Sequence, residues 1–194
     1  MYISHIEMMK AFMRALRRAN LDVAHTKGFN PNMRMVFALP LPLGVTSDSE
    51  YVDIWFNKPY EPYEVLEALA DKLPEGIQLL MSFEVEKAAL MEDVGSAIYH
   101  FKIEENKEIK RALDQLIQMD EINVFKSNKK GNIDLLPLIY KIDYHDNQAF
   151  SVLCKAGAKG NLNPHLLINA LEMYTDIKIN VVSINRNKLF LKIP

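Results

Sequence analysis

Residues 3–44 read ISHIEMMKAFMRALRRANLDVAHTKGFNPNMRMVFALPLPLG, and this stretch decides the fold. Ser4 followed three residues later by Glu7 is a capping box, in which the serine oxygen accepts from a first-turn amide and the glutamate reaches back. Apolar residues then recur at helical spacing, with Ile6, Met9, Met13 and Leu16 flanked by Phe12 and Ala19. We therefore expect an amphipathic helix that begins after Ser4 and ends near Arg18.

The polar face of this helix is cationic. Lys10, Arg14 and Arg17 are spaced i, i+4 and i+7, so they form one basic stripe, and Arg18 lies beside it. The stripe could be a solvated surface or a contact for an anionic partner.

A polar linker, residues 20–32, follows the helix. Gly28 permits a positive φ, and Pro31 forces Asn30 to be extended, so residues 27–32 are expected to form an ordered loop. Residues 34–39 then read as a strand that Pro40 ends, because proline cannot donate to a sheet ladder.

These residues resemble a bacterial family, the radical-SAM-linked proteins. The matching motifs are Ile-Ser-His-x-(Asp/Glu) from Ile3, Arg-Ala-x-Arg-Arg-Ala-x-Leu from Arg14, Gly-Phe-Asn-Pro from Gly28, Pro-Leu-x-x-Gly from Pro40 and Ser-x-x-Glu-Tyr from Ser47. Members of the family are free-standing or fused behind a cobalamin-type radical SAM domain, and they have no established activity. The resemblance therefore implies a radical SAM protein as partner and no mechanism. Two departures are Glu7, where Asp is commoner, and a start at Met1, where relatives carry an extra strand.

Composition excludes several classes of protein. The chain has 194 residues, 49% of them hydrophobic and 25% charged, and lacks an apolar run long enough to span a membrane. A single cysteine, Cys154, fits a reducing cytoplasm. The net charge is +4 over residues 1–42, −11 over residues 43–125 and +5 over residues 126–194. The two basic ends could bind an anionic partner, or these charged side chains could serve only to keep the surface solvated.

The remaining pattern indicates an α+β fold with two ferredoxin-like (split βαβ) subdomains, at residues 1–87 and 95–194. In the first subdomain, strands are expected at residues 50–56 and 77–85 around a helix at residues 60–73. The second should contain strands at residues 97–103, 122–126 and 149–155, and an extended stretch at residues 133–144 that is broken near Pro137. Helices are expected at residues 105–119 and 164–174, and a terminal hairpin of residues 177–184 and 188–193 across Arg186-Asn187. An antiparallel sheet with helices on one face would leave its other face open to a partner.

The first subdomain lacks most of its first strand, because residues 1–3 supply only a stub. Either a neighbouring subunit fills the gap or the open reading frame begins upstream, and the second explanation is favoured by the relatives' extra strand.

No metal or cofactor motif is present in the sequence. The five histidines form no i, i+4 pair, and there is no Cys-x-x-x-Cys-x-x-Cys, P-loop or Gly-x-Gly-x-x-Gly motif, so we expect no metal and no cofactor in this chain. Asp22 is more typical of a structural carboxylate than of a catalytic one, and Cys154 of a buried thiol.

Two functions remain. The first is an accessory module that binds RNA or another phosphate-bearing partner and works with a radical SAM protein, because cations beside loop amides suit phosphate. Phe29 is then either a base-stacking residue, with Tyr2 and Tyr51, or a loop anchor in the core. The alternative is an enzyme, with RNA modification as its candidate reaction class and a pocket around Ser4, His5, Glu7 and residues 28–31. The candidate binding residues are Ser4, His5, Glu7, Arg14, Arg17, Arg18, Lys27, Gly28, Phe29, Asn30, Pro31 and Arg34.

Overall fold

The computed structural model describes residues 4–85, 90–125 and 131–191. Two expectations lie outside these residues: the strand stub at residues 1–3 and the stacking role of Tyr2. The fold is α+β, with helices packed against a mixed five-stranded sheet and two small two-stranded sheets.

The N-terminal half contains the predicted helix α1 (His5–Arg18), followed by β1 (Met35–Phe37), β2 (Val45–Ser47), β3 (Val52–Ile54) and α2 (Pro62–Ala70). β1 pairs antiparallel with β3. Beneath them, Phe12, Ala15 and Leu16 of α1 are buried in a cluster with apolar residues of β1 and α2. Ile6, expected on the buried face of α1, is 62% exposed.

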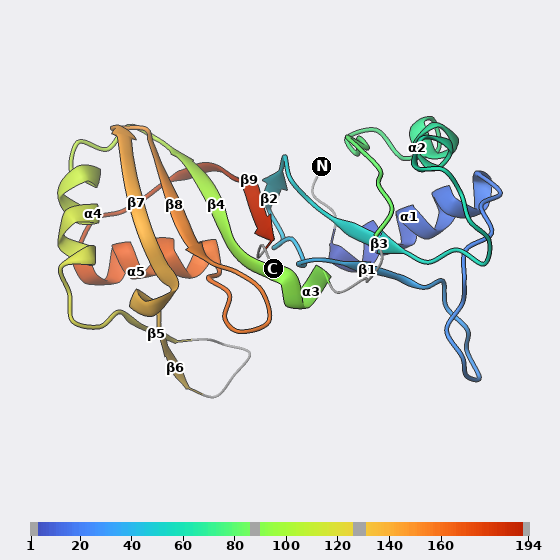
Figure 1. The fold of residues 1–194 in the computed structure, drawn as a ribbon. Coiled ribbons are helices and arrows are strands. Elements are labelled where there is room, and N and C mark those ends of the chain that lie inside the picture. Colours follow the sequence, from blue (N-terminus) through green and yellow to red (C-terminus); the bar gives the residue numbers. More distant parts are fainter. Residues whose placement is uncertain (1–3, 86–89, 126–130, 192–194) are drawn as a thin grey trace.

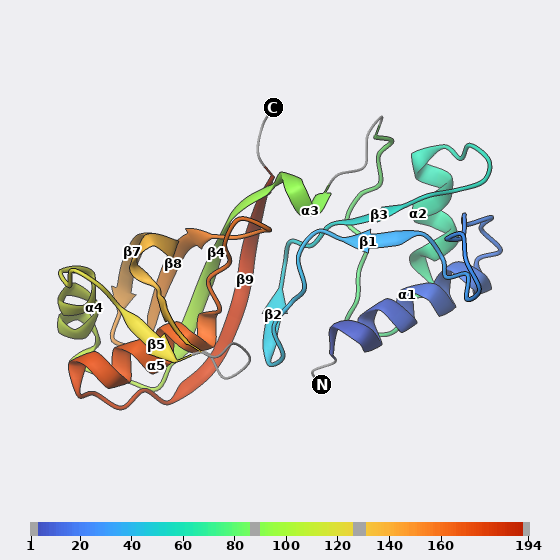
Figure 2. The ribbon, with the colours of Figure 1, turned by 90° about the horizontal axis from the view of Figure 1, so that it is seen from below.

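The C-terminal half contains α3 (Leu90–Asp93), β4 (Val94–Ile103), α4 (Ile109–Ile117), β5 (Asn123–Phe125), β6 (Asn132–Asp134), η1 (Leu136–Leu138), β7 (Ile139–Asp146), β8 (Ala149–Lys155), α5 (Pro164–Thr175) and β9 (Val181–Leu191). The main sheet has the order β2-β9-β4-β8-β7, in which β2 runs parallel to β9 and the other neighbours are antiparallel. Helices α4 and α5 lie on one face of this sheet (Figures 1 and 2).

Two strand predictions are wrong. Residues 77–85 form no strand, and Leu80, Met81 and Phe83 in this segment are exposed. No described strand is paired with this segment. The predicted terminal hairpin is instead the single strand β9, and the Arg186-Asn187 pair lies inside it. Tyr99 of β4 pairs with Arg186 and Ile98 with Lys188, so Asn187 is the extra residue of a β-bulge rather than a turn residue.

The short strand β2 was not predicted, and it carries a segment of the N-terminal half into the C-terminal sheet. Val45 pairs with Ile184 of β9, and Ala38, Leu39 and Val45 belong to the large core cluster of the C-terminal half. The division into subdomains at residues 87 and 95 stays a prediction. In the N-terminal half, β1 and β2 belong to different sheets, so the described residues do not establish a ferredoxin-like order there.

The capping box at Ser4 is confirmed. The Glu7 amide donates to Ser4 Oγ at 3.3 Å, and the Ser4 amide donates to Glu7 Oε2 at 2.7 Å. Because Ser4 donates to it, the pKa of Glu7 lies below its ordinary value. A lowered carboxyl pKa stabilises the fold above the unfolded-state pKa, and this contribution is lost as the pH falls through the folded-state pKa.

Ser4→Ala should therefore lower the free energy of unfolding by about 0.5–2 kcal/mol, because one first-turn amide loses its acceptor. Urea denaturation measures this change. An unchanged midpoint would show that Ser4 does not cap α1 in solution.

Candidate nucleic-acid interface

The cationic face of α1 is exposed. Lys10, Arg14 and Arg17 all point to solvent, and among the residues that the structure describes Arg14 and Arg17 form no ion pair or hydrogen bond. Arg18 differs from them, because its guanidinium donates to the carbonyl of Lys72 just beyond α2. Arg18 thus ties α1 to the end of α2, while Arg14 and Arg17 remain available to a partner.

The linker after α1 folds into a long hairpin. The Arg34 amide donates to the carbonyl of Ala24 at 2.7 Å, and the Thr26 amide donates to that of Asn32 at 2.8 Å. The Asn32 amide also donates to Thr26 Oγ1 at 3.0 Å, which closes the loop at residues 27–31. The ordered loop predicted from the sequence is confirmed by these contacts.

Phe29 at the hairpin tip is fully exposed and is no core anchor. The preceding Gly28 has φ of 139°, a conformation that side chains disfavour although the surrounding space is open. The loop therefore holds an aromatic side chain away from the core. In this exposed position the apolar ring gains no stabilisation from burial. Lys27 and Asn30 beside it are exposed as well.

The hairpin lies at the C-terminal end of α1 (Figures 1 and 2), whose last turn contains Arg17 and Arg18. At the base of the hairpin, the Arg34 guanidinium lies 4.6 Å from the ring centroid of Trp55. A guanidinium stacked on an indole keeps its charge and exposes one edge to solvent. Arg17 thus lies in the helix turn nearest the hairpin, Arg34 at the hairpin base, and Lys27 and the exposed Phe29 in the loop at its tip.

The structure does not bring Ser4, His5 and Glu7 to this hairpin. They lie at the N-terminal end of α1, the opposite end of the helix (Figures 1 and 2). His5 contacts Phe37 edge-on, with ring centroids 5.5 Å apart. Two hollows on the described surface, of about 530 Å³ along α4 around Lys110 and about 430 Å³ between Asn20 and Tyr60, are lined by none of Ser4, His5 and Glu7.

Asp22 has a structural role in the described contacts. Its carboxylate accepts from Asn57 Nδ2 at 2.7 Å, and its carbonyl accepts from the Asn57 amide. No group of three or more potential metal ligands is present among the described residues, and no described helix has the length and apolar character that a membrane crossing needs.

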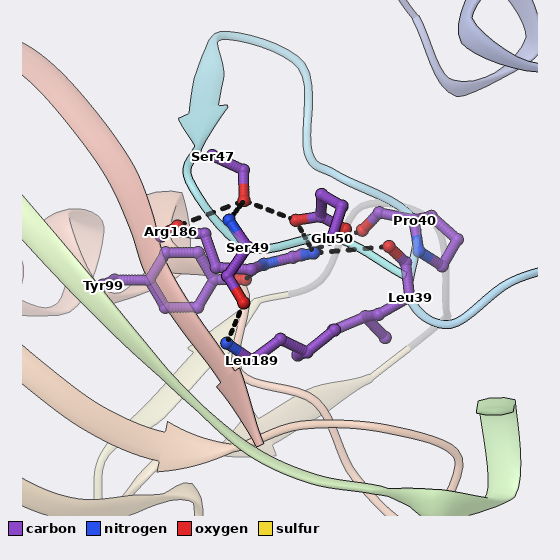
Figure 3. Close-up of polar contacts among 8 residues, drawn as sticks. All are labelled: Leu39, Pro40, Ser47, Ser49, Glu50, Tyr99, Arg186 and Leu189. Atoms are coloured by element: carbon purple, nitrogen blue, oxygen red, sulfur yellow. Dashed lines mark hydrogen bonds and ion pairs between the residues drawn. The ribbon is translucent and has the colours of Figure 1, made fainter. Parts of the chain in front are cut away.

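Sequence reasoning missed a buried arginine that joins the two halves. Arg186 of β9 is completely buried, and Figure 3 shows its guanidinium between β4 and the segment around Glu50. Nη1 lies 2.7 Å from Glu50 Oε1, Nε donates to the Tyr99 hydroxyl at 3.1 Å, and Nη1 and Nη2 donate to the carbonyls of Leu39 and Pro40. The arginine therefore fixes the chain on both sides of β2.

The Ser-x-x-Glu-Tyr motif supplies the counter-charge. Ser47 Oγ lies 2.6 Å from Glu50 Oε1 and donates to it, while Ser49 Oγ accepts from the Leu189 amide of β9. Burial raises the pKa of Glu50, whereas Arg186 and Ser47 act to lower it. A raised pKa means that this group stabilises the fold below its unfolded-state pKa and loses that contribution as pH rises through the folded-state pKa. The Ser-x-x-Glu-Tyr motif was the sequence signal that could have indicated this ion pair. Its partner Arg186 is distant in sequence, so the motif alone did not identify it.

Cys154 of β8 is buried beneath the sheet, as predicted. Burial raises the pKa of its thiol to about 12. Since only the thiolate reacts, the folded protein should react with a thiol reagent about 10³-fold or more slowly than the unfolded chain near pH 8. Stopped-flow labelling with and without denaturant measures the ratio, and comparable rates would contradict this burial.

Comparison with known proteins gives the family of this chain. A family model described as "Uncharacterized protein conserved in bacteria (DUF2344)" matches residues 1–164. The chain belongs to the DUF2344 family. The bacterial family of unknown function expected from the N-terminal motifs is thereby confirmed, and the DUF2344 match includes α1, the hairpin and Glu50 but ends before Arg186. No curated protein matches the chain.

Proposed function

We propose that this DUF2344 protein is an accessory module that binds single-stranded RNA or a similar phosphate-bearing strand at the hairpin and the cationic face of α1. The observation that carries the proposal is an exposed Phe29 on a closed hairpin that follows α1, together with Arg14 and Arg17 of α1, which have no partner among the described residues. Arginine and lysine bind phosphates at any sequence, and an exposed ring stacks on an unpaired base.

The partner and the fold of each half belong to the same proposal. The motif resemblance supports a radical SAM protein as the partner, which would perform the chemistry in the cytoplasm while this chain binds the substrate strand.

The order β9-β4-β8-β7, with one helix between β4 and β7 and another between β8 and β9, supports a ferredoxin-like C-terminal unit.

The decisive variant replaces Arg14 and Arg17 with glutamine. Glutamine keeps helix propensity, so the fold should persist. Affinity for a single-stranded RNA should fall at low salt, and the slope of log affinity against log salt should become shallower by roughly 0.7–0.9 for each phosphate that the variant no longer neutralises. Filter binding at several salt concentrations measures both quantities.

A matched control removes two exposed cations far from the hairpin, by Lys107→Gln and Lys159→Gln, and changes the net charge equally. The control should bind RNA almost as the wild type does. Equal slopes for wild type, control and the arginine variant would mean that the stripe is only a solvated face.

A further inference from the structure

The face of the main sheet opposite the helices carries a row of polar side chains. Tyr99, Phe101, Phe150 and Val152 are buried in the core with α4 and α5. Because side chains alternate along a strand, His100 and Ser151 occupy the other face. They are directly paired across β4 and β8, and both are half-buried.

Two histidines converge on one hydroxyl at this place. Ser151 Oγ lies 3.0 Å from His100 Nδ1 and 2.8 Å from His145 Nε2. The two rings are 5.4 Å apart and inclined by 31°. His145 reaches the serine because of a bulge in β7: Tyr144 pairs with Phe150 and Asp146 with Ala149, so His145 is the extra residue between them.

The charges around this cluster come from each neighbouring strand. On β4, Lys102 is exposed, and on β7, Asp146 is exposed while Asp143 is paired with Lys141 at 2.6 Å. On β9, the residue opposite His100 is the neutral Asn185. Its side chain binds Thr46 and Asp48 of the β2 segment, at 2.6 Å in both cases. Lys102 and Asp146 act on the charge of His100 in opposite directions.

Proton counting shows what changes when the histidines become charged. A serine hydroxyl has one proton, and each neutral imidazole has one N–H. With both rings neutral, the three groups can satisfy one another. When both rings are protonated, each donates to Ser151 Oγ, and the serine proton becomes available to an outside acceptor. The outer nitrogens, Nε2 of His100 and Nδ1 of His145, then also carry protons, and neither has a hydrogen bond among the described residues.

We propose that His100, Ser151 and His145 form a proton-linked binding site for a phosphate group, with Lys102 as a permanent cation beside it. Phosphate oxygens can accept hydrogen bonds from imidazolium, ammonium and hydroxyl donors at the same time. A neutral ligand would not require this combination of cationic donors. The site is separate from α1 and the hairpin and does not depend on the proposed function. The phosphate could be a free anion or part of a nucleic acid, since both present the same oxygens.

The electrostatics of the site agree with this geometry. Partial burial, His145 and Lys102 lower the pKa of His100, and Asp146 acts in the opposite direction. A lowered histidine pKa stabilises the fold above the unfolded-state value and loses that contribution as the pH falls. A bound anion should reverse this loss of stability at low pH, because the anion stabilises the protonated form of the imidazole rings.

The first test measures binding of sulfate and inorganic phosphate to the wild-type protein by NMR, at about pH 6 and about pH 8. Sulfate keeps its charge across this range, so any pH dependence of its binding belongs to the protein. We expect sulfate to bind more tightly as pH falls, by up to about tenfold per pH unit for each proton taken up. The imidazole resonances of His100 should titrate at higher pH when the anion is present.

Variants assign the effect to these residues. His100→Gln and His145→Gln should each remove most of the pH dependence, and Ser151→Ala should weaken binding at low pH, whereas Lys107→Gln near α4 should change nothing. The Arg14→Gln/Arg17→Gln variant should keep the site intact, so failure of this inference and failure of the RNA proposal are distinguishable.

Competition experiments identify the source of the phosphate. Competition by a short 5′-phosphorylated oligonucleotide, but not by its unphosphorylated form, would identify the source as a terminal phosphate. Competition by both would indicate a backbone phosphate, and competition by neither a free anion.

Two results would overturn the proposal: a sulfate affinity that is equal at both pH values, or a His100 pKa that saturating anion does not move. The second measurement uses the wild-type protein, so it decides the question even if the variants fold poorly.

Discussion

Glu50→Ala should lower the free energy of unfolding by about 3–5 kcal/mol, the largest stability loss that we expect from one substitution in this chain. The reason is that Arg186 is completely buried and Glu50 is its ion-pair partner at 2.7 Å. Without the carboxylate, a buried guanidinium keeps its charge, since arginine does not deprotonate. For a chain of this length the melting temperature should fall by about 6–20 °C.

A double-mutant cycle separates the pair from its neighbours. Glu50→Gln preserves the shape and an acceptor oxygen, so it should cost clearly less than Glu50→Ala. Arg186→Met combined with Glu50→Ala should cost less than the sum of the single changes, because no buried charge then lacks a partner. Additive losses would show that Glu50 and Arg186 do not interact in solution.

Local patterns were enough to predict the elements whose stability is local. The capping box and the apolar spacing of α1 are both contained in adjacent turns, so Ser4 and Leu16 have the positions expected of them. Pro164 likewise begins α5 at the predicted residue. In each case the interactions that define the element lie within a few residues.

The wrong predictions concern residues whose conformation depends on distant partners. Arg186-Asn187 resembles a turn by composition, yet Arg186 is buried because Glu50, Leu39 and Tyr99 together satisfy its guanidinium. Residues 77–85 have strand composition, but a strand also needs a neighbour to pair with. Neither requirement can be read from nearby residues.

The candidate interface shows the same division. The stripe of Arg14 and Arg17 follows from helical spacing alone, and both residues are exposed as predicted. The exposure of Phe29 could not be decided, because an aromatic residue in a loop anchors it or projects from it according to the hairpin geometry. The convergence of His100 and His145 on Ser151 depends on strand pairing and one bulge.

Phe29→Ala should weaken binding of single-stranded RNA by about 5- to 150-fold, which corresponds to about 1–3 kcal/mol for one base stacked on an aromatic ring. The fold should be unaffected, because the ring is fully exposed and contributes no buried area. The salt dependence should also stay unchanged, since an uncharged ring neutralises no phosphate. Weaker affinity at constant salt slope is therefore the mark of stacking, and it differs from the effect of replacing Arg14 and Arg17.

Phe125→Ala provides the matched control, because Phe125 is another exposed aromatic residue, 65% accessible at the end of β5. It should leave RNA affinity within about twofold of the wild type. Phe29→Tyr and Phe29→Trp should retain binding, since both keep a π-face for stacking, whereas Phe29→Leu keeps only apolar area and should bind weakly. If the Phe29→Leu variant binds RNA as tightly as the wild type, the tip contributes hydrophobic contact without base stacking. If the Phe29→Ala variant also binds RNA as tightly as the wild type, the hairpin takes no part in RNA binding. Any RNA affinity then belongs to α1 or to the open face of the sheet.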